Sequence, residues 1–492
     1  MPVLKEIPVE VTGHVPVKIW TDKIEESAER QLTTIARLPF VVGHVAAMPD
    51  VHYAPGATVG SVFATREVLL PTAVGSDIGC GMLAQPFAVE ASELSATFLR
   101  ELHEAVKRHI PTGLAHHRAP QSWEGLEDEG RYTRGVAGLV RERGAWHLGS
   151  LGGGNHFIEL CQDGAGMVWL LLHSGSRGPG AAVAKHHVAR ALALREKLAL
   201  KTTRDLPALP LDTQEGQEYL TDLSWAQEYA AENRERMARA FVELFADLLQ
   251  QRLRVDLAFD PAARINIHHN YAAREEIGGE VAWVHRKGAT RAGAGELGII
   301  PGSMATGSYI VRGLGNPESF NSCSHGAGRA MSRGDALRAI SVEAFAHKMR
   351  GIVAEVGREF LDEAPQAYKD LDTVLHHQSD LVEPVQRLRT ILNVKGAGKA
   401  DLKRFLAADD AAPRKRVVVD RSRDKDDPVQ ARKLAQRRAR RRGSGEWRGR
   451  EERRVWRESP HSSLLSLLSS PALSTGRRRG EALPSGRDSP LR

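Results

Sequence analysis

Histidine, cysteine and aspartate side chains recur in glycine-rich segments of this 492-residue chain, where they could bind a metal ion. Asp77 and Cys80 are three positions apart with a glycine between them, so one turn can direct a carboxylate and a thiol at the same point. His173 follows the apolar run Val168–Leu172 and precedes two serines and Arg177, which suits a metal ion beside a phosphate. Each segment alone is also explained by a buried cysteine on a tight turn or by a histidine at the end of a strand.

Two further segments add histidines to this set. Gly152–Glu159 begins with three glycines, which let the backbone come close to a ligand and offer N–H groups to an anion, and His156 follows them. Ile265–Tyr271 contains the adjacent residues His268 and His269. Side chains alternate along an extended segment, so these two should face opposite sides and at most one should bind a metal.

Two segments later in the chain could bind a phosphate or a nucleotide. Pro301–Met304, with Ser308 shortly after it, predicts a turn that offers backbone amides and hydroxyl groups. His325 lies among small residues, which leave room for a bulky group at its imidazole ring. Arg329 and Arg333 follow and could neutralise phosphate through forked hydrogen bonds. The alternative for His325 is an ordinary histidine in a turn.

Taken together, these segments predict a site for one or two metal ions beside a phosphate pocket. Coordination chemistry by itself favours zinc, because thiolate and imidazole ligands suit zinc and because zinc binds more tightly than manganese. The reaction stays open at this point, since residue types and spacing define a site and name no substrate.

The elements that must position these groups are those of an α+β protein. The polar segments alternate with short apolar runs typical of buried strands, and functional groups commonly lie on loops at strand ends. Helical periodicity, with Ser92 as the expected cap of the second helix, predicts helices over residues 22–36, 92–109, 224–253 and 335–356. Strands are expected at Val168–Leu172, Glu280–Val284 and Ser308–Val311, and residues 112–135 and 200–222 are typical of surface insertions.

The charge of the chain is divided unevenly. Its formal net charge is +7, but residues 397–492 contain 26 basic and 13 acidic residues, whereas residues 1–396 contain 42 basic and 48 acidic residues. The segment 397–492 is rich in Arg, Ser, Pro and Gly and has too little apolar character to offset chain entropy, so we expect a disordered basic tail. The overall charge therefore says little about nucleic-acid binding by the body of the chain.

Cysteine usage and hydropathy exclude other classes of protein. Three cysteines are too few, and odd in number, for a disulfide scaffold, and they fit a reducing, cytoplasmic compartment. The sequence contains no run of 18 apolar residues, so no membrane interaction is expected.

The polar segments resemble, in type and order, the motifs of the RtcB family of GTP-dependent RNA ligases. The matching motifs are Asp77–Met82, Gly152–Glu159, His173–Gly178, His268–Tyr271, Arg286–Ala289, Pro301–Met304 and Ser322–Arg329. Motifs in this order cover nearly all of residues 1–396. The resemblance implies a single large mixed-sheet catalytic domain of the RtcB-like fold over residues 1–396, followed by the disordered basic tail 397–492.

The resemblance also implies a role for each site residue. It places two Mn²⁺ ions on Asp77, Cys80, His156, His173 and His269. Catalytic roles fall to His325, Lys287 and Arg329, and Arg177 and Arg333 would hold RNA phosphate together with Arg329. GTP, as the GMP donor, would contact Asn155, His156, Phe157, Ile158, Glu159, His269, Asn270, Pro301, Gly302, Ser303, Met304, Ser308, His325, Gly326, Ala327, Gly328 and Lys395.

The implied activity is the joining of an RNA 3′-phosphate or 2′,3′-cyclic phosphate end to a 5′-hydroxyl RNA end, in tRNA splicing or RNA repair. His325 would carry GMP covalently and pass it to the RNA 3′-phosphate before the ends are joined. The resemblance further implies a cytoplasmic monomer and is compatible with an activating protein partner. The alternatives are a metal-dependent phosphoesterase acting on RNA ends and a non-catalytic RNA-binding protein that works through the basic tail.

Two features depart from the family pattern. Pro55 stands where a lysine is expected in the glycine-rich run after Met48–His52, so the phosphate contact of that lysine is not expected here. Family members usually end at a motif that corresponds to Val394–Gly396. Residues 397–492 are therefore either a disordered extension or translation beyond the natural stop, and they must leave the pocket without blocking it.

Overall fold

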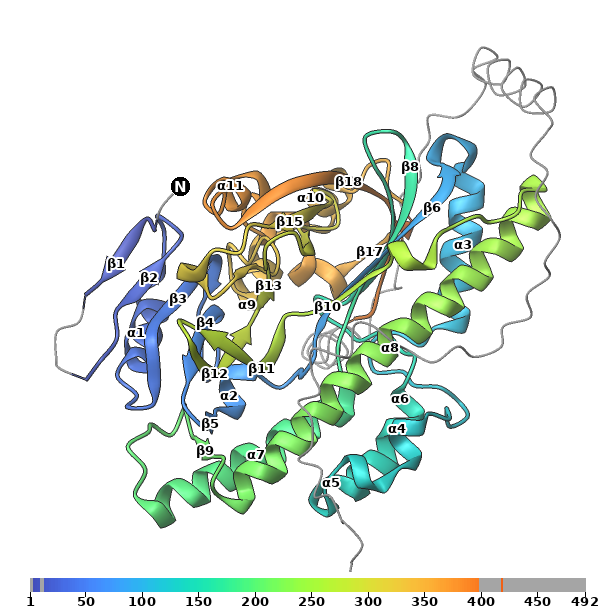
Figure 1. Cartoon of the computed structure of the whole chain (residues 1–492). Helices are drawn as coiled ribbons and strands as arrows, with labels where there is room; N and C mark the ends of the chain where they lie inside the picture. Colours follow the sequence, from blue (N-terminus) through green and yellow to red (C-terminus); the bar gives the residue numbers. More distant parts are fainter. Residues whose placement is uncertain (1–2, 9–12, 398–416, 419–492) are drawn as a thin grey trace, which may run out of the picture. The chain divides into compact units, whose positions relative to one another are not determined.

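Two β-sheets form the framework of the protein. The computed structural model describes residues 3–8, 13–397 and 417–418, and Figure 1 shows their arrangement. Among these residues the first sheet has six strands, and all neighbours are antiparallel except β2 and β3. In spatial order they are β1 (Lys5–Ile7), β2 (Val17–Ile19), β3 (Val41–His52), β4 (Val59–Thr65), β12 (Glu280–Lys287) and β11 (Asn270–Ile277).

The second sheet is antiparallel throughout and has seven strands within the same described ranges. In spatial order they are β10 (Ile265–His268), β6 (Gly81–Glu90), β8 (Met167–Ser174), β7 (Phe157–Gln162), β18 (Val382–Lys395), β15 (Ser308–Gly313) and β14 (Leu297–Pro301). The chain passes from this sheet to the first through the single residue His269, which lies between the edge strands β10 and β11.

Three short strand pairs complete the sheet structure of the described residues. They are β5 (Val68–Leu69) with β9 (Leu209–Pro210), β13 (Ala289–Arg291) with β16 (Ser322–Ser324), and β17 (Glu355–Val356) with β19 (Val417–Val418). The pair formed by β13 and β16 matters for the site, because β16 ends directly before His325.

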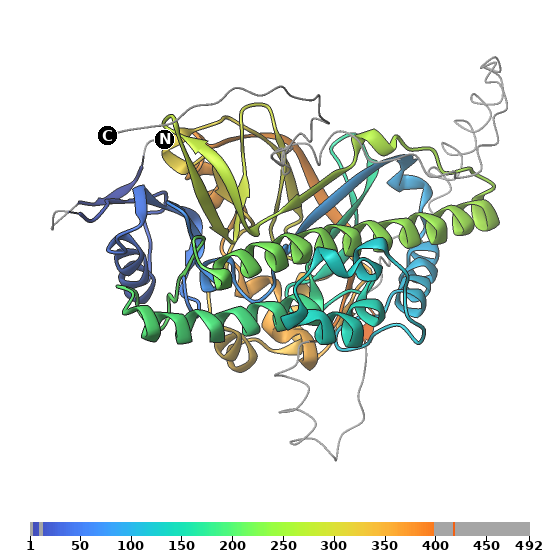
Figure 2. The same cartoon turned by 60° about the horizontal axis from the view of Figure 1, so that its bottom comes forward.

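Long helices cover the strands. Figure 2 shows α7 (Arg177–Leu198) and α8 (Gln214–Leu253) side by side below the strands. The other α-helices are α1 (Glu26–Ala36), α2 (Pro71–Val74), α3 (Ala96–His109), α4 (Glu124–Glu127), α5 (Arg134–Leu139), α6 (Ala145–His147), α9 (Arg333–Ala339), α10 (Val342–Lys348) and α11 (Leu371–His376). The short 3₁₀ helices are η1 (Ala91–Glu93), η2 (Glu129–Arg131), η4 (Pro261–Ala263), η5 (Pro317–Ser319), η6 (Arg358–Glu363) and η7 (Pro365–Ala367), and η3 (Val140–Gly144) is a turn of π-helix.

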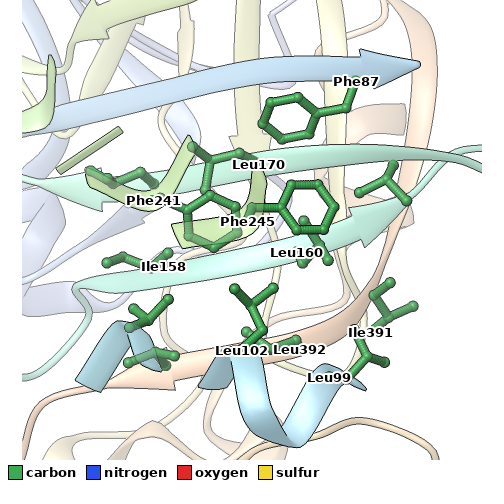
Figure 3. Packing of buried hydrophobic residues seen from close by; sticks show 14 of the residues in the cluster. Phe87, Leu99, Leu102, Ile158, Leu160, Leu170, Phe241, Phe245, Ile391 and Leu392 are labelled. Atoms are coloured by element: carbon green, nitrogen blue, oxygen red, sulfur yellow. The ribbon is translucent and has the colours of Figure 1, made fainter. Parts of the chain in front are cut away.

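The largest apolar cluster of the described chain joins α8 to the second sheet. Figure 3 shows Phe241 and Phe245 of α8 next to Leu160 of β7 and Leu170 of β8. These side chains are fully buried, and Leu102 of α3 belongs to the same cluster. Truncation of a buried phenylalanine to alanine costs about 3–5 kcal/mol of stability. This packing therefore fixes α8 against the strands that carry the polar motifs.

The α+β class is confirmed, and the helix predictions differ in their accuracy. The helix expected over residues 92–109 begins at Ala96, because the hydroxyl of Ser95 accepts a hydrogen bond from the backbone N–H of Phe98. Ser92 as its cap is wrong, since Ser92 lies in the turn η1. The helix expected over residues 22–36 begins at Glu26.

The helix expected over residues 224–253 begins ten residues earlier, at Gln214, where the hydroxyl of Thr213 accepts a hydrogen bond from the N–H of Gly216. The prediction that residues 200–222 are a surface insertion is therefore wrong at its end, because Tyr219 and Asp222 are buried in α8. Residues 112–135 hold the short elements α4 and η2.

The single helix expected over residues 335–356 is also wrong. The chain forms α9 and then α10, because Ser341 caps a new helix by accepting a hydrogen bond from the N–H of Ala344. Gly351, with φ +83°, lies beyond α10 in a conformation that a helix does not use. Helix α7 was not predicted, since Gly178, Pro179 and Gly180 are typical of a turn. Proline is tolerated in a first helical turn, where its missing N–H has no partner to lose.

The predicted disorder of the tail 397–492 falls almost entirely outside the described residues. Within the described ranges, no helix is both long enough and apolar enough to cross a membrane.

Candidate active site

A pocket of about 560 Å³ brings together the motifs that the sequence singled out. Cys80, His173, His269 and His325 line it, as does Lys395 at the end of β18. These residues come from the second sheet, from its link to the first sheet and from the end of β16, and their positions in the chain are far apart. The register of the strands explains how they meet.

One end of the second sheet aligns most of the metal-binding candidates in a row. His173 on β8 pairs with Met82 on one side and with Phe157 on the other, and Phe157 pairs with Lys395 of β18. Cys80 and His156 directly precede the strands β6 and β7, and His269 directly follows β10. Because neighbouring strands are antiparallel, the starts of β6 and β7 lie beside the ends of β8, β10 and β18.

The donor atoms of the five predicted metal ligands converge. Cys80 Sγ lies 3.4 Å from His156 Nε2 and 3.3 Å from His173 Nε2. His156 Nε2 lies 2.9 Å from Asp77 Oδ2, and His173 Nε2 lies 3.3 Å from His269 Nε2. The five residues form two groups of three that share Cys80, with all ligand atoms of each group within 4.8 Å of one another. Each group of three could hold a metal ion.

Burial favours the metal-binding form of the histidines in this cluster, but not that of Cys80. It lowers the pKa of His173 and of His269 well below the ordinary value, with nearby cationic groups adding to the effect. Both imidazoles are therefore neutral and keep a lone pair. Burial raises the pKa of the Cys80 thiol, and the charge of Asp77 raises it further. Burial alone would raise the pKa of Asp77, but hydrogen bonds with His156 and Cys80 lower it. A cation bound here would displace the thiol proton.

The backbone carbonyl of Asn155 fixes the orientation of His173. It lies 3.1 Å from His173 Nδ1, so Nδ1 carries the proton and Nε2 points its lone pair at the cluster. The main chain of His269 is also fixed, since its N–H donates to the carbonyl of Cys80 at 2.8 Å. The adjacent His268 lies on the other side of the strand, as its alternation predicts. His268 Nδ1 is 2.8 Å from the carbonyl oxygen of Gly79.

Sequence reasoning missed the role of α8 beneath this cluster. Arg234, which is fully buried, donates from Nη1 to the carbonyls of Gly79 and Ser174 at 2.8 and 2.9 Å. The neighbouring Asn233 accepts from Gly149 N–H and donates to Gly175 O. These two side chains fasten the turns before β6 and after β8 to the helix. No sequence signal distinguished them from the other polar residues of α8.

His325 forms a close pair with a buried aspartate of β3. Its Nδ1 lies 2.6 Å from Asp50 Oδ2, which also accepts the backbone N–H of His325 at 3.1 Å and that of Gly326 at 3.3 Å. A carboxylate can only accept, so Nδ1 donates, and in the neutral imidazole the lone pair is then on Nε2. The ring centroids of His325 and His269 are 4.8 Å apart, so this nitrogen is next to the metal cluster. Asp50 was assigned no role, although a lone carboxylate in an apolar strand was a usable signal.

The predicted phosphate-binding cations surround a carboxylate that the sequence did not single out. Glu363 of η6 lies 3.2 Å from Lys395 Nζ and 3.5 Å from Arg329 Nη1, and it forms an ion pair with Arg333. The Tyr368 hydroxyl donates to the same carboxylate. These cations lower the pKa of Glu363 to about 2 although burial alone would raise it. The carboxylate therefore carries its charge throughout the neutral range.

Lys287 and Arg177 lie differently from the other cations. Lys287 lines the pocket, but its ammonium donates to the carbonyls of Pro55, Ala57 and Thr72 at 2.7, 2.8 and 3.2 Å. Burial lowers its pKa to about 8. Arg177 is not among the lining residues, because its guanidinium donates to Gly113 O and Ser150 Oγ behind the metal cluster.

Most of the predicted nucleotide-binding residues line the pocket. The residues brought together there are Asn155, Phe157, Glu159, His269, Asn270, Pro301, Gly302, Ser303, Met304, Ser308, His325, Gly326, Ala327, Gly328 and Lys395. His156 belongs to the metal cluster instead, and Ile158 lies in the apolar core because side chains alternate along β7. Burial raises the pKa of Glu159 to about 7, and Asn393 donates a hydrogen bond to its carboxyl group at 2.7 Å.

The chain leaves the pocket through a crossing of three glycines. After Lys395, the backbone of Gly396 lies against Gly113 and Gly152, whose own main chains are joined by a hydrogen bond of 3.3 Å. A Cβ atom on Gly396 would lie 2.1 Å from Gly113 N and 2.6 Å from Gly152 O. Only glycine fits this approach, so the crossing fixes the position of Lys395.

The site has the side chains that an enzyme acting with a metal ion on a phosphate would need, and comparison with known proteins names the family of the chain. The sequence model of a family described as "tRNA-splicing ligase RtcB" matches residues 31–129 and 122–396. The RNA-splicing ligase RtcB of Escherichia coli K12 is 42% identical over 405 residues, which cover 78% of this chain and 98% of the relative. The RNA-splicing ligase RtcB of Mycobacterium tuberculosis is 32% identical over 441 residues, covering 74% and 100%. The chain belongs to the RtcB family.

Proposed function

We propose that this protein is an RNA ligase that joins an RNA 3′-phosphate or 2′,3′-cyclic phosphate end to a 5′-hydroxyl RNA end, using GTP and Mn²⁺. The names of its relatives support RNA ligation in tRNA splicing, with RNA repair as a related use of the same chemistry. The observation that carries the proposal within this chain is the pair formed by Asp50 and His325. A metal-dependent phosphoesterase, the main alternative, needs no such oriented histidine.

His325 has the features of a nucleophile. The hydrogen bond from Nδ1 to Asp50 Oδ2 fixes the tautomer in which Nε2 is unprotonated. In the proposed first step, Nε2 attacks the α-phosphorus of GTP, a P–N bond forms, and the bond to the pyrophosphate oxygen breaks. Asp50 would stabilise the positive charge that develops on the ring. The product is His325 carrying GMP.

Two transfers would follow from this histidine. An oxygen of the RNA 3′-phosphate attacks the GMP phosphorus, the P–N bond breaks, and an RNA–ppG end results. The 5′-hydroxyl oxygen of the second RNA end then attacks the RNA phosphorus, loses its proton and expels GMP. A 2′,3′-cyclic phosphate is first hydrolysed to the 3′-phosphate. We assign the phosphates in these steps to Lys395, Arg329 and Arg333, which line the pocket.

The five clustered ligands fit two divalent cations. A thiol, three imidazoles and one carboxylate are compatible with zinc and with manganese, and we propose manganese on the basis of the family. Bound cations would lower the negative charge on phosphate and leaving-group oxygens. Asp77, Cys80, His156, His173 and His269 would hold them. Asn155 O keeps the His173 ring in the binding orientation.

Covalent labelling tests the proposal. The protein is incubated with GTP labelled at the α-phosphate and with Mn²⁺, and acid-labile label on the chain is measured, as expected for a P–N bond. His325→Ala should abolish the label. His347→Ala, which changes an exposed histidine of α10, should leave it unchanged. Absence of label in the wild-type protein, or full label in the His325 variant, would overturn the assignment.

A further inference from the structure

Tyr53 is an exposed aromatic residue at the rim of the active-site pocket. The exposed residues among those lining the pocket are Glu25, Tyr53, Ser76, Asn155, Ser332 and Arg333. Tyr53 is the sole aromatic residue of this rim, which we define by these six described residues, and 53% of its surface is exposed. The other large apolar residues exposed on the described chain do not line the pocket. An aromatic ring in this place has no partner within the polar rim.

The backbone after Tyr53 is held rigidly. Gln31 of α1 donates to the carbonyls of Ala54 and Gly56 at 2.6 and 2.9 Å and accepts the N–H of Ala54 at 3.4 Å. The buried ammonium of Lys287 donates to Pro55 O and Ala57 O from the other side. Gly56 adopts φ +83°, and a Cβ there would lie 2.6 Å from Thr72 Cβ. The segment 54–57 is therefore fixed from two directions.

The backbone before Tyr53 is equally well fixed, and it leads directly to the nucleophile. Lys369 donates from Nζ to Pro49 O at 3.2 Å and to Val51 O at 3.1 Å, on either side of Asp50. Asp50 in turn binds His325. Tyr53 thus follows β3 by one residue, three residues after the aspartate that orients the reacting ring. Its position relative to the reaction centre is set by the strand.

We propose that the ring of Tyr53 is a stacking platform for the nucleobase of a terminal RNA nucleotide, which would make Tyr53 a determinant of RNA-end binding. This inference rests on the proposed ligase function. An aromatic ring on a fixed backbone is available at the rim, and every base has a flat face to stack on it. Arg333 on the same rim provides a cation for the phosphate of such a nucleotide.

The position of the ring distinguishes the RNA base from the guanine of GTP. Of the residues expected to contact the guanine nucleotide, Asn155 lies on the rim, whereas the others, such as Phe157, Glu159 and Lys395, which are 8%, 2% and 7% exposed, lie deeper in the pocket. Tyr53 lies on the rim, where the RNA has to enter. Loss of its ring should therefore affect the steps that use RNA and leave the reaction with GTP unchanged.

Steady-state ligation and guanylylation of three proteins test this inference. Tyr53→Ala should raise the KM for RNA ends roughly ten-fold, in line with the loss of one base–aromatic stack. Tyr53→Phe keeps the ring and should behave like the wild type. Both variants should form the histidine–GMP adduct at the wild-type rate, which also shows that they are folded. An unchanged KM in Tyr53→Ala would overturn the platform.

Abasic substrates identify the nucleotide that stacks. One RNA lacks the base at the nucleotide carrying the 3′-phosphate, and the other lacks the base at the 5′-hydroxyl nucleotide. The wild type should bind one of these abasic RNAs less tightly than the intact RNA. Tyr53→Ala should bind that abasic RNA and the intact RNA equally tightly, because the stacking contact is already lost in this variant. Equal losses in both proteins, for both substrates, would refute the inference.

Failure of the inference and failure of the proposed function give different results. Binding of fluorescent RNA, measured by anisotropy at fixed salt, requires no catalysis. If the wild type forms no GMP adduct, the ligase proposal fails, while weaker RNA binding by Tyr53→Ala than by Tyr53→Phe still supports the platform. If the adduct forms normally and the two variants bind RNA equally, the platform alone fails.

Discussion

Glu363 Oε2 lies 3.2 Å from Lys395 Nζ, and both side chains are almost completely buried. The same carboxylate pairs with Arg333 and lies within 3.5 Å of Arg329. The cations that we assign to phosphate binding therefore already share one negative charge in the protein. A phosphate that enters the pocket meets cations held close together in advance, and it has to compete with Glu363 for their hydrogen bonds.

Replacement of Glu363 by glutamine should destabilise the protein by about 3–5 kcal/mol at pH 7, because it leaves buried cations without their shared carboxylate. Urea unfolding measures the change. The pKa of Glu363 is lowered to about 2, so its contribution is present above about pH 4.5 and is lost as the pH falls towards 2. The difference in unfolding free energy between the wild type and Glu363→Gln should therefore shrink as the pH falls from 4.5 to 2. Glu343→Gln, an exposed change on α10, serves as the control, and equal stability of the two variants at pH 7 would contradict the prediction.

Replacement of Asp50 by asparagine should slow transfer of GMP to His325 by about 100-fold or more, because the amide can donate to Nδ1 and so favour protonation of Nε2. The rate of label uptake from α-labelled GTP is the measurement, with a melting curve to confirm folding. Asp212→Asn changes an exposed aspartate and should keep the normal rate. A two-fold or smaller effect of Asp50→Asn would show that this pair does not orient the nucleophile.

Replacement of Glu159 by glutamine should change how stability depends on pH. Burial raises the pKa of Glu159 to about 7, so the folded protein binds this proton more tightly than the unfolded chain does. Stability is therefore lost as the pH rises from about 4.5 to 7. The glutamine variant avoids this loss and should be more stable than the wild type at pH 8, by about 3 kcal/mol at most, with little difference at pH 4.5. The free energies of unfolding of the wild type and of Glu159→Gln, measured at pH 4.5 and at pH 8, test this prediction. An equal difference at both pH values would contradict it.

Replacement of Cys80 by serine should remove most metal binding, because the two groups of ligands share this sulfur. Mn²⁺ should raise the melting temperature of the wild type, since a ligand that binds only the folded state stabilises it. The variant should show little rise and should retain less metal by elemental analysis. Cys161→Ser changes a buried cysteine outside these groups and should respond like the wild type. An undiminished response of Cys80→Ser to Mn²⁺ would exclude the shared-sulfur arrangement.

The sequence singled out the five candidate metal ligands because their residue types are chemically specific. Thiol, imidazole and carboxylate groups beside glycines have few structural explanations, and the structure brings Asp77, Cys80 and the histidines together. Alternation along the strand also separated His268 from His269 correctly. The α+β class followed from short apolar runs between helical segments, although the topology of the two sheets did not.

The partners of these residues could not be predicted in the same way. Asp50 and His325 are 275 positions apart, and Glu363 meets Arg329 only through the folding of η6 against the pocket. A single sequence carries no signal for such contacts. The sequence could not predict the break between α9 and α10, because a serine such as Ser341 can lie within a helix or cap one. In the structure Ser341 caps α10, and Phe345 and Met349 then pack in an apolar cluster.

The crossing of Gly396 with Gly113 and Gly152 has a genetic consequence. A single methyl group on Gly396 has no room there, and Gly113 is limited both by its φ of +65° and by the backbone of Ala397, 3.0 Å from its would-be Cβ. Substitutions at these distant positions should therefore be alleles with one phenotype, the displacement of Lys395 from the pocket. A mutation that compensates for a substitution of Gly396 or Gly113 should be sought near the crossing. A screen that scores only residues next to the substrate would overlook both glycines.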